Sequence, residues 1–162
     1  MNPAEVIASY LEDQELEHER FDETSFAVAL PGEKRLKTAC LLTVGAHALE
    51  IEAFVLRAPE ENREQVYAYL LQRNARMYAV SWAVDATGDV YLSGRVPLAS
   101  VSAEELDRIL GCVLEYADGT FNTLLELGFG SSIRREWAWR VKRGESLANL
   151  QAFKDFAERT SE

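Results

Sequence analysis

The spacing of apolar side chains predicts a short N-terminal helix followed by extended chain. Asn2 and Pro3 form a helix start, with a capping side chain before a proline at the first helical position. A helical stripe over residues 3–14 then consists of Val6, Ile7, Tyr10 and Leu11. From residue 16 to 58 the period changes to two, which is typical of half-buried strands. This pattern predicts an edge strand at 16–21, a strand at 26–30, and an antiparallel hairpin of strands 36–44 and 48–57.

The middle of the chain returns to a helix and then to two strands. The segment 58–61, Ala-Pro-Glu-Glu, has the composition of a helix start. Arg73 and Arg76 lie at the other end, where a helix favours positive charge, and Asn74 is a candidate helix stop. Alternating apolar residues over 78–96 then predict two strands around a glycine-containing loop.

The last third of the chain is predicted to be helical. Ser102 and Glu105 have the spacing of a capping box. Behind them an apolar stripe in steps of three and four runs to about Leu127. Asp118-Gly119 is a candidate kink, and the segment 128–130, Gly-Phe-Gly, is predicted to end the helix. A final helix is predicted at about 145–158.

The predicted order is one helix, three or four strands, a helix, two strands and two helices. This order indicates an α+β fold, in which helices pack on one face of a twisted antiparallel sheet. No internal repeat or linker divides the sequence, so we expect residues 1–162 to form a single domain.

Composition and charge narrow the function classes. The chain is 48% hydrophobic and 27% charged, with a net charge of −10. A strongly acidic protein repels nucleic-acid backbones, so we expect no nucleic-acid partner. No apolar run is long enough to cross a membrane, and the N-terminus lacks the features of a signal peptide, so we expect a cytoplasmic protein without membrane contact.

Familiar catalytic and metal-binding patterns are missing from the sequence. Cys40 and Cys112 have no motif spacing and are expected to be buried small hydrophobes. His18 and His47 have no metal-site companions. The segment 128–133 begins like a dinucleotide fingerprint but lacks its third glycine and its preceding strand. We therefore expect neither a catalytic residue nor a metal or other cofactor.

One stretch near the C-terminus combines aromatic and basic side chains and is the candidate site. Its members are Arg134, Arg135, Trp137, Trp139, Arg140 and Arg143. Guanidinium groups could clamp a phosphate or carboxylate. The alternative, favoured by about two to one, is internal pairing with acidic groups such as Glu126, Glu136 and Glu145. The two tryptophans point to one face if this stretch is extended, either packing on the long helix or binding a partner.

Four short motifs carry a resemblance to a known family. They are RNARMY at 73–78, GDVYL at 88–92, FNTLLELGF at 121–129 and REWAWR at 135–140. Together they resemble the YbjN family of small bacterial proteins, and most of all its actinobacterial branch. The resemblance is close over about 60–153 and looser over 25–58. The family is also called a sensory transduction regulator.

The YbjN resemblance implies a fold similar to the type III secretion chaperones, which are typically dimers that hold an unfolded stretch of a secreted protein. It supplies no catalytic residues. Our leading hypothesis is therefore a non-enzymatic binding or regulatory protein of chaperone-like form, a homodimer with a protein partner. The alternative is a protein or enzyme that binds a small anionic ligand with the arginines of 134–143.

Overall fold

The computed structural model describes residues 2–158. Its elements are α1 (Pro3–Asp13), β1 (His18–Arg20), β2 (Ser25–Pro31), β3 (Lys37–Val44), β4 (Ala48–Leu56), α2 (Arg63–Asn74), β5 (Val80–Val84), β6 (Val90–Pro97), α3 (Ala103–Arg143) and α4 (Lys154–Glu158). Two 3-10 helices lie at Leu98–Ser100 and Ala148–Phe153. This order confirms the predicted α+β fold, with four strands before the second helix.

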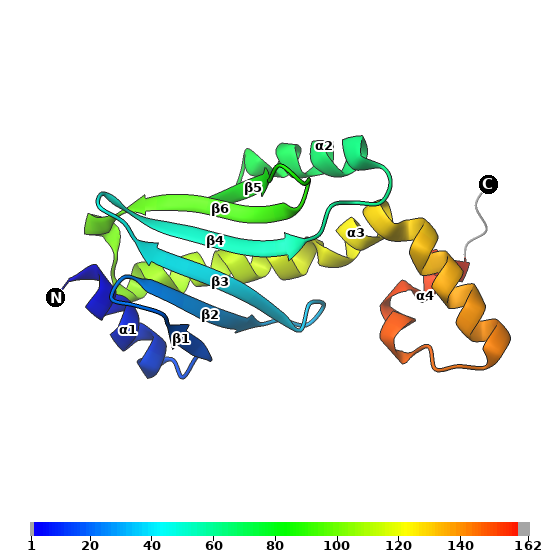
Figure 1. The fold of residues 1–162 in the computed structure, drawn as a ribbon, viewed down its shortest axis with the longest axis horizontal. Coiled ribbons are helices and arrows are strands. Elements are labelled where there is room, and N and C mark those ends of the chain that lie inside the picture. The colour runs from blue at the N-terminus through cyan, green and yellow to red at the C-terminus, as the bar shows by residue number, and fades with distance from the viewer. Residues whose placement is uncertain (1, 159–162) are drawn as a thin grey trace.

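The strands form one six-stranded antiparallel sheet in the order β1-β2-β3-β4-β6-β5. Helices α1 and α3 lie behind it in Figure 1, and α2 contacts both β5 and α3. The sheet and α1 follow the predicted pattern. The Asn2 side chain caps α1 by accepting from the Glu5 amide at 2.9 Å.

Only one face of the sheet is buried, which explains the period of two in the sequence. A row of side chains crosses five strands on that face, and each is at most 5% exposed: Val28, Cys40, Ala53, Leu92 and Trp82. Leu106, Ile109, Val113 and Leu124 of α3 are fully buried in the same core cluster. Burial of each large apolar side chain stabilises the fold by about 1.5–3 kcal/mol. The opposite face, which we call the open face, is not covered by any helix of the described chain.

Two polar contacts hold helices to the sheet at fixed points. The Asp118 carboxylate accepts the Lys34 and Arg35 amides at 2.9 and 2.8 Å, which joins α3 to the turn between β2 and β3. The Asn74 side chain accepts the Trp82 amide at 2.6 Å and donates to the Trp82 carbonyl at 3.1 Å. Asn74 thus ends α2, as expected, and also satisfies the outer edge of β5.

The long helix does not end at Gly128 or Gly130, which corrects the sequence prediction. It continues to Arg143 and bends once at Phe129, whose φ of −136° and ψ of 19° are not helical. Asp118-Gly119, the expected kink, lies inside the regular helix. Gly144 ends the helix with a left-handed φ of 67°.

The remaining corrections concern helix starts and the C-terminal segment. The second helix begins at Arg63, after Asn62, and not at 58–61. A 3-10 helix and a five-residue helix replace the single helix expected at 145–158. Ser102 caps α3 by accepting the Glu105 amide at 3.1 Å, as predicted. The Glu105 side chain is bonded to Tyr78 and Arg108 instead of reaching back.

The bend divides the structure into a body, residues 2–128, and an arm, residues 129–158. In Figure 1 the arm projects beyond the end of the sheet, and its short helices fold back beside the last turns of α3. No helix of residues 2–158 has the length and hydropathy needed to cross a membrane. The prediction that residues 1–162 form one domain stays a prediction.

Candidate functional site

The arm is attached to the body where the loop after β4 meets the bend in α3. We call this contact the joint, and it consists of residues 59–62 and 127–132. A bend leaves helical carbonyl and amide groups without partners. The loop supplies donors, since the Glu60 and Glu61 amides both reach the Gly128 carbonyl, at 3.0 and 3.2 Å. The Asn62 side chain donates to the Leu127 carbonyl at 2.9 Å.

The same loop also supplies acceptors for the helix beyond the bend. The Glu61 carboxylate accepts the Ser131 amide at 2.7 Å and the Ser131 hydroxyl at 2.8 Å. The Ser132 hydroxyl lies 3.1 Å from Glu60 Oε2. Hydrogen bonds from Ser131 lower the pKa of Glu61, and attraction to Arg134 and Arg135 lowers it further. Glu61 therefore caps the part of α3 that follows the bend, although it lies about 70 residues earlier in the chain.

The two glycines of the joint permit close approach. A β-carbon on Gly128 would lie 3.1 Å from Pro59 Cβ, and one on Gly130 would lie 2.9 Å from Phe156 Cζ. Neither glycine has a positive φ. The two glycines thus leave space for residues that are distant in the sequence. They do not end the helix, contrary to the prediction.

The six residues of the candidate site all lie on the arm, within the last turns of α3. Because this stretch is helical and not extended, Trp137 and Trp139 point to different sides. Trp137 is 7% exposed, whereas Trp139 is 49% exposed. The two tryptophans would share one face only on an extended backbone, and this stretch is helical.

Two of the four arginines are held in ion pairs within the arm. Arg140 Nε donates to Glu136 Oε1 at 2.6 Å, and its Nη1 donates to the Ser146 carbonyl at 3.0 Å. Arg143 Nε lies 3.1 Å from Glu145 Oε1, and its Cζ lies 4.5 Å from the Trp139 ring centroid. These contacts match the internal pairing anticipated for Glu136 and Glu145. Glu126 forms no ion pair with an arginine within residues 2–158.

The other two arginines are held differently. Arg134 Cζ lies 4.1 Å from the Phe156 ring centroid, and its buried Nε has no hydrogen-bond partner in the described structure. Arg135 Nη2 donates to the Ser132 hydroxyl at 3.1 Å on an exposed side of the helix. Ser132, Arg135, Glu136 and Trp139 border a hollow of about 480 Å³. The arm therefore presents Arg135, Trp139 and the paired Arg143 to solvent.

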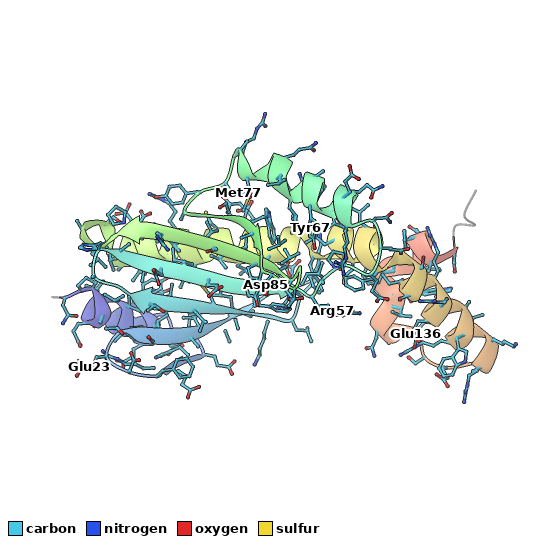
Figure 2. The ribbon with its side chains drawn as sticks, turned by 45° about the horizontal axis from the view of Figure 1, so that its top comes forward. Glu23, Arg57, Tyr67, Met77, Asp85 and Glu136 are labelled. Atoms are coloured by element: carbon cyan, nitrogen blue, oxygen red, sulfur yellow. The ribbon has the colours of Figure 1, made fainter. Side chains whose placement is uncertain are left out.

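Figure 2 places Glu136 on the arm and Arg57 at the neighbouring end of the body. Arg57 pairs with Glu60 at 3.0 Å and stacks on the Phe129 ring, with 4.3 Å from Cζ to the centroid. Sequence reasoning missed Arg57, Glu60 and Glu61, because they contact residues about 70 positions later in the chain. No group of three or more potential metal ligands occurs among residues 2–158.

Comparison with solved structures defines the class of fold. A chain of the ExsC–ExsE complex matches 75% of this protein with a TM-score of 0.56 and 20% identity, and 92% of that chain is covered. A chain of the ExoU–SpcU complex of the Pseudomonas aeruginosa type III secretion system matches 75% with a TM-score of 0.54 and 17% identity, covering 96% of that chain. A chain of the HopA1–SchA chaperone–effector complex matches 71% at 0.52 and 16%, covering 89%. The fold is that of the type III secretion chaperones.

Sequence comparison gives the family. The model of the YbjN family, described as "Putative bacterial sensory transduction regulator", matches residues 3–126. The protein belongs to the YbjN family. The family match ends three residues before the bend at Phe129, so it corresponds to the body and not to the arm.

Two mycobacterial relatives show how far the similarity extends. An uncharacterised protein of Mycobacterium leprae is 60% identical over 126 residues, which is 78% of this chain and 68% of that protein. An uncharacterised protein of Mycobacterium bovis is 52% identical over 153 residues, which is 91% of this chain and 84% of that protein. A match over 91% of the chain must include part of the arm.

We expect Glu61→Ala to loosen the arm and leave the body intact, because the Ser131 amide and hydroxyl both lose their acceptor. The loss of a helix cap costs about 1 kcal/mol, which corresponds to roughly fivefold easier opening of the arm. Hydrogen exchange measured by mass spectrometry should be faster over 131–143 and unchanged over 103–124. Glu64→Ala is the control, because Glu64 is exposed on α2 and forms no ion pair in the described chain.

The protection of the arm against hydrogen exchange should decrease at low pH. Because the pKa of Glu61 is lowered in the folded protein, its contribution is fully present above the ordinary carboxyl pKa of about 4.3. The contribution is lost as the pH falls through the lower folded value. Equal exchange of the arm in Glu61→Ala and the unmodified protein at pH 7 would contradict the proposed capping role.

Proposed function

We propose that this protein is a non-enzymatic binding protein of chaperone-like form, which holds an acidic segment of a protein partner on its arm. The observation that carries this proposal is the half-exposed Trp139 on a basic helix that projects from an acidic body. We further propose that the protein is a homodimer and that it works in the cytoplasm without a nucleic-acid or membrane partner. The chaperone-like fold and the family support a binding role.

The exposed side of the arm has the composition of a recognition surface. Arg135, Trp139 and Lys142 are exposed and follow each other in steps of four and three, so they share one side of the helix. Tryptophan and arginine are enriched among the residues that dominate binding energy. We call these three residues the arm surface. Its positive charge, on a chain of net charge −10, favours an acidic partner segment.

The other members of the block support the arm surface. Arg143 stacks on Trp139, and its ion pair with Glu145 fixes its position. The ion pair of Arg140 with Glu136 leaves Arg135 without a carboxylate within 4.0 Å in the described structure. Trp137 is buried on the opposite side of the same turns. An arm surface that is already ordered loses less entropy when it binds.

We expect Trp139→Ala with Arg135→Glu to abolish binding to acidic peptides that contain an aliphatic or aromatic residue. The measurement is a peptide array that tiles the proteins of the host, read with purified protein at low and at moderate salt. Peptides bound by the unmodified protein should be acidic, and their binding should fall as salt screens the charges. Leu36→Ala is the control, because Leu36 is 83% exposed and lies in the turn after β2. Bound peptides that are not acidic, or that the double variant retains, would rule out the arm surface.

A second proposal places a small anionic ligand at the same block. It is supported by the buried Arg134 Nε, which has no hydrogen-bond partner within residues 2–158, and by the hollow beside Arg135. In that case inorganic phosphate should shift the side-chain Nε–H resonances of Arg134 and Arg135. Acidic peptides would then bind only as competitors of phosphate.

The homodimer is supported by the chemistry of the open face. Its centre is a row of apolar side chains, Ala29, Ala39, Phe54, Tyr91 and Ala83, and Leu41 lies beside it in the next row, opposite Glu52. Leu41 and Phe54 are 44% and 39% exposed, and the Phe54 and Tyr91 rings meet edge to face with 5.4 Å between centroids. An apolar centre with a polar rim is the usual anatomy of a protein interface.

The rim of the open face favours a second copy of the chain as the occupant. It carries both signs of charge, in the pairs Arg95–Glu50 at 3.7 Å and Lys37–Glu17 at 2.8 Å. A surface with both signs can complement itself across a two-fold axis. The sheet edges are poorer candidates. At one edge, the Asn74 side chain already hydrogen-bonds to the amide and carbonyl of Trp82 in β5. At the other edge, β1 is only three residues long.

We expect Leu41→Glu to convert the dimer into a monomer, because it replaces an apolar contact by a second carboxylate opposite Glu52. Leu71→Glu is the matched control, because Leu71 is also an exposed leucine, at 68%, but lies on α2 away from the open face. The measurement is the mass from light scattering after size exclusion. A monomeric mass for the unmodified protein at high concentration, or a dimer that survives Leu41→Glu, would contradict this proposal.

A further inference from the structure

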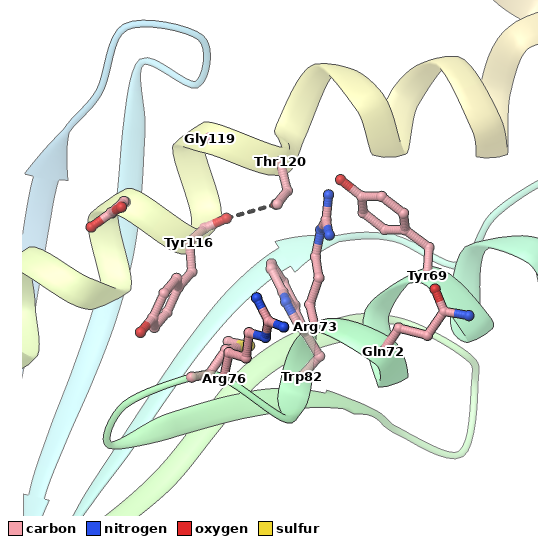
Figure 3. Close-up of a pocket in the computed structure, with 10 residues that line it drawn as sticks. Tyr69, Gln72, Arg73, Arg76, Trp82, Tyr116, Gly119 and Thr120 are labelled. Atoms are coloured by element: carbon pink, nitrogen blue, oxygen red, sulfur yellow. Dashed lines mark hydrogen bonds between the residues drawn. The ribbon is translucent and has the colours of Figure 1, made fainter.

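A cleft in the body opens between the C-terminal half of α2, the strand β5 and the middle of α3 (Figure 3). Its volume is about 600 Å³, which is within the range of small-molecule sites. The cleft lies in the body and shares no residue with the arginine block of the arm. It was not a candidate from the sequence, where its basic residues were assigned only to a helix end.

Two arginines border this cleft and lack acidic partners. Arg73 and Arg76 extend from the end of α2 toward α3 in Figure 3. Neither has a carboxylate within 4.0 Å in the described chain, although the protein is strongly acidic. Arg73 stacks on Tyr69, with 3.7 Å from Cζ to the ring centroid. Six other arginines do find carboxylates: Arg20, Arg57, Arg95, Arg108, Arg140 and Arg143. Arg35 and Arg63 lack one but donate to backbone carbonyls instead, and Arg134 and Arg135 lie on the arm.

The walls of the cleft are held in place by hydrogen bonds. The two bonds between Asn74 and the Trp82 backbone fix the end of α2 to β5. The Tyr78 amide donates to the Tyr116 hydroxyl at 2.9 Å, which ties the connecting loop to α3. Trp82 is 5% exposed and closes the base of the cleft. The backbone that carries Arg73 and Arg76 is therefore held in place on both sides of the cleft.

Gly119 lines the opposite wall and has no packing reason to be glycine. A β-carbon at this position would meet no atom within 4 Å, and its φ is not positive. Glycine inside a helix is unfavourable relative to alanine. Gly111 of the same helix is equally free of contacts, whereas Gly128 and Gly130 make room for Pro59 and Phe156; of the four, only Gly119 lines the cleft. The absence of a side chain at Gly119 keeps the α3 wall of the cleft open.

We propose that this cleft binds a small organic anion. Its phosphate or carboxylate group lies between Arg73 and Arg76, whose guanidinium groups offer forked donors. Its uncharged part lies over Tyr69 and Met77, beside Gly119. Glu115 also lines the cleft, and its negative charge opposes a second anionic group there. A ligand with one anionic end and a neutral or cationic body, such as a nucleoside monophosphate, fits these charges.

The test is a titration of isotope-labelled full-length protein with adenosine monophosphate, inorganic phosphate and adenosine, followed by amide NMR shifts. Adenosine monophosphate and phosphate should shift amides of 69–82 and 112–120 at concentrations up to about 10 mM, and adenosine should not. The double variant Arg73→Ala, Arg76→Ala should lower the affinity for both anions by about tenfold or more. Arg95→Ala is the control, because Arg95 lies on the open face and pairs with Glu50.

A second variant separates the cleft from general attraction of anions to surface arginines. Gly119→Leu fills the α3 wall and leaves both arginines in place. Gly119→Leu should weaken the binding of adenosine monophosphate by about tenfold, while the affinity for inorganic phosphate should stay unchanged. Three results would overturn the proposal: no shifts with either anion, shifts that the double arginine variant retains, or shifts confined to 131–143. The last result would place the anion on the arm.

Discussion

The structure depends on how one helix continues past the end of the sheet that it covers. Helix α3 buries its first half against the sheet and then bends at Phe129. A bend in a helix is stable only when the backbone groups that it frees find new partners. Residues 60–62 provide these partners on both sides, with amides for the Gly128 carbonyl and the Glu61 carboxylate for the Ser131 amide. The direction of the arm follows from this exchange of hydrogen bonds.

The distribution of positive charge connects the fold to the proposed binding roles. In a chain of net charge −10, an arginine readily finds an acidic neighbour, and Arg140 and Arg143 do so within the arm. Exposed ion pairs contribute little to stability, but they hold side chains in one orientation. Among the arginines without a carboxylate partner, those that border a hollow are the informative ones. Arg135 belongs to the arm surface and borders the hollow there, and Arg73 and Arg76 border the cleft between α2 and α3.

Local sequence signals predicted much of the body. The cap of Asn2 on α1, the strand pattern of 36–57 and the cap of Ser102 on α3 each depend on residues close together in the chain. Such signals can be read from the sequence because the partners are neighbours. The family resemblance added the class of fold. It could not locate a binding site, because it supplied no functional residues, and the family match itself ends at residue 126, before the arm begins.

The arm was predicted less well, because its conformation depends on distant contacts. Gly128 and Gly130 resemble a helix stop, yet they are required by Pro59 and Phe156. No local pattern reveals that Glu61 will cap a helix that resumes 70 residues later. The expected helix stop at the glycines also left the backbone around Trp137 and Trp139 undetermined. On the actual helix one tryptophan is buried and the other is half exposed.

The central claim is that the joint holds the arm in one fixed orientation, so that the arm surface is presented ready to bind. The most direct measurement is the distance distribution between spin labels at the exposed positions Glu64, on α2 of the body, and Lys142, on the arm, by pulsed electron paramagnetic resonance. The labelled protein is diluted into an excess of unlabelled protein, so that only distances within one copy are measured. Cys112 is replaced by alanine for this purpose. Cys40 can stay, since complete burial raises its pKa to about 12 and keeps it unreactive. The account predicts a single narrow distribution. A broad distribution, or several separate distances, would contradict it.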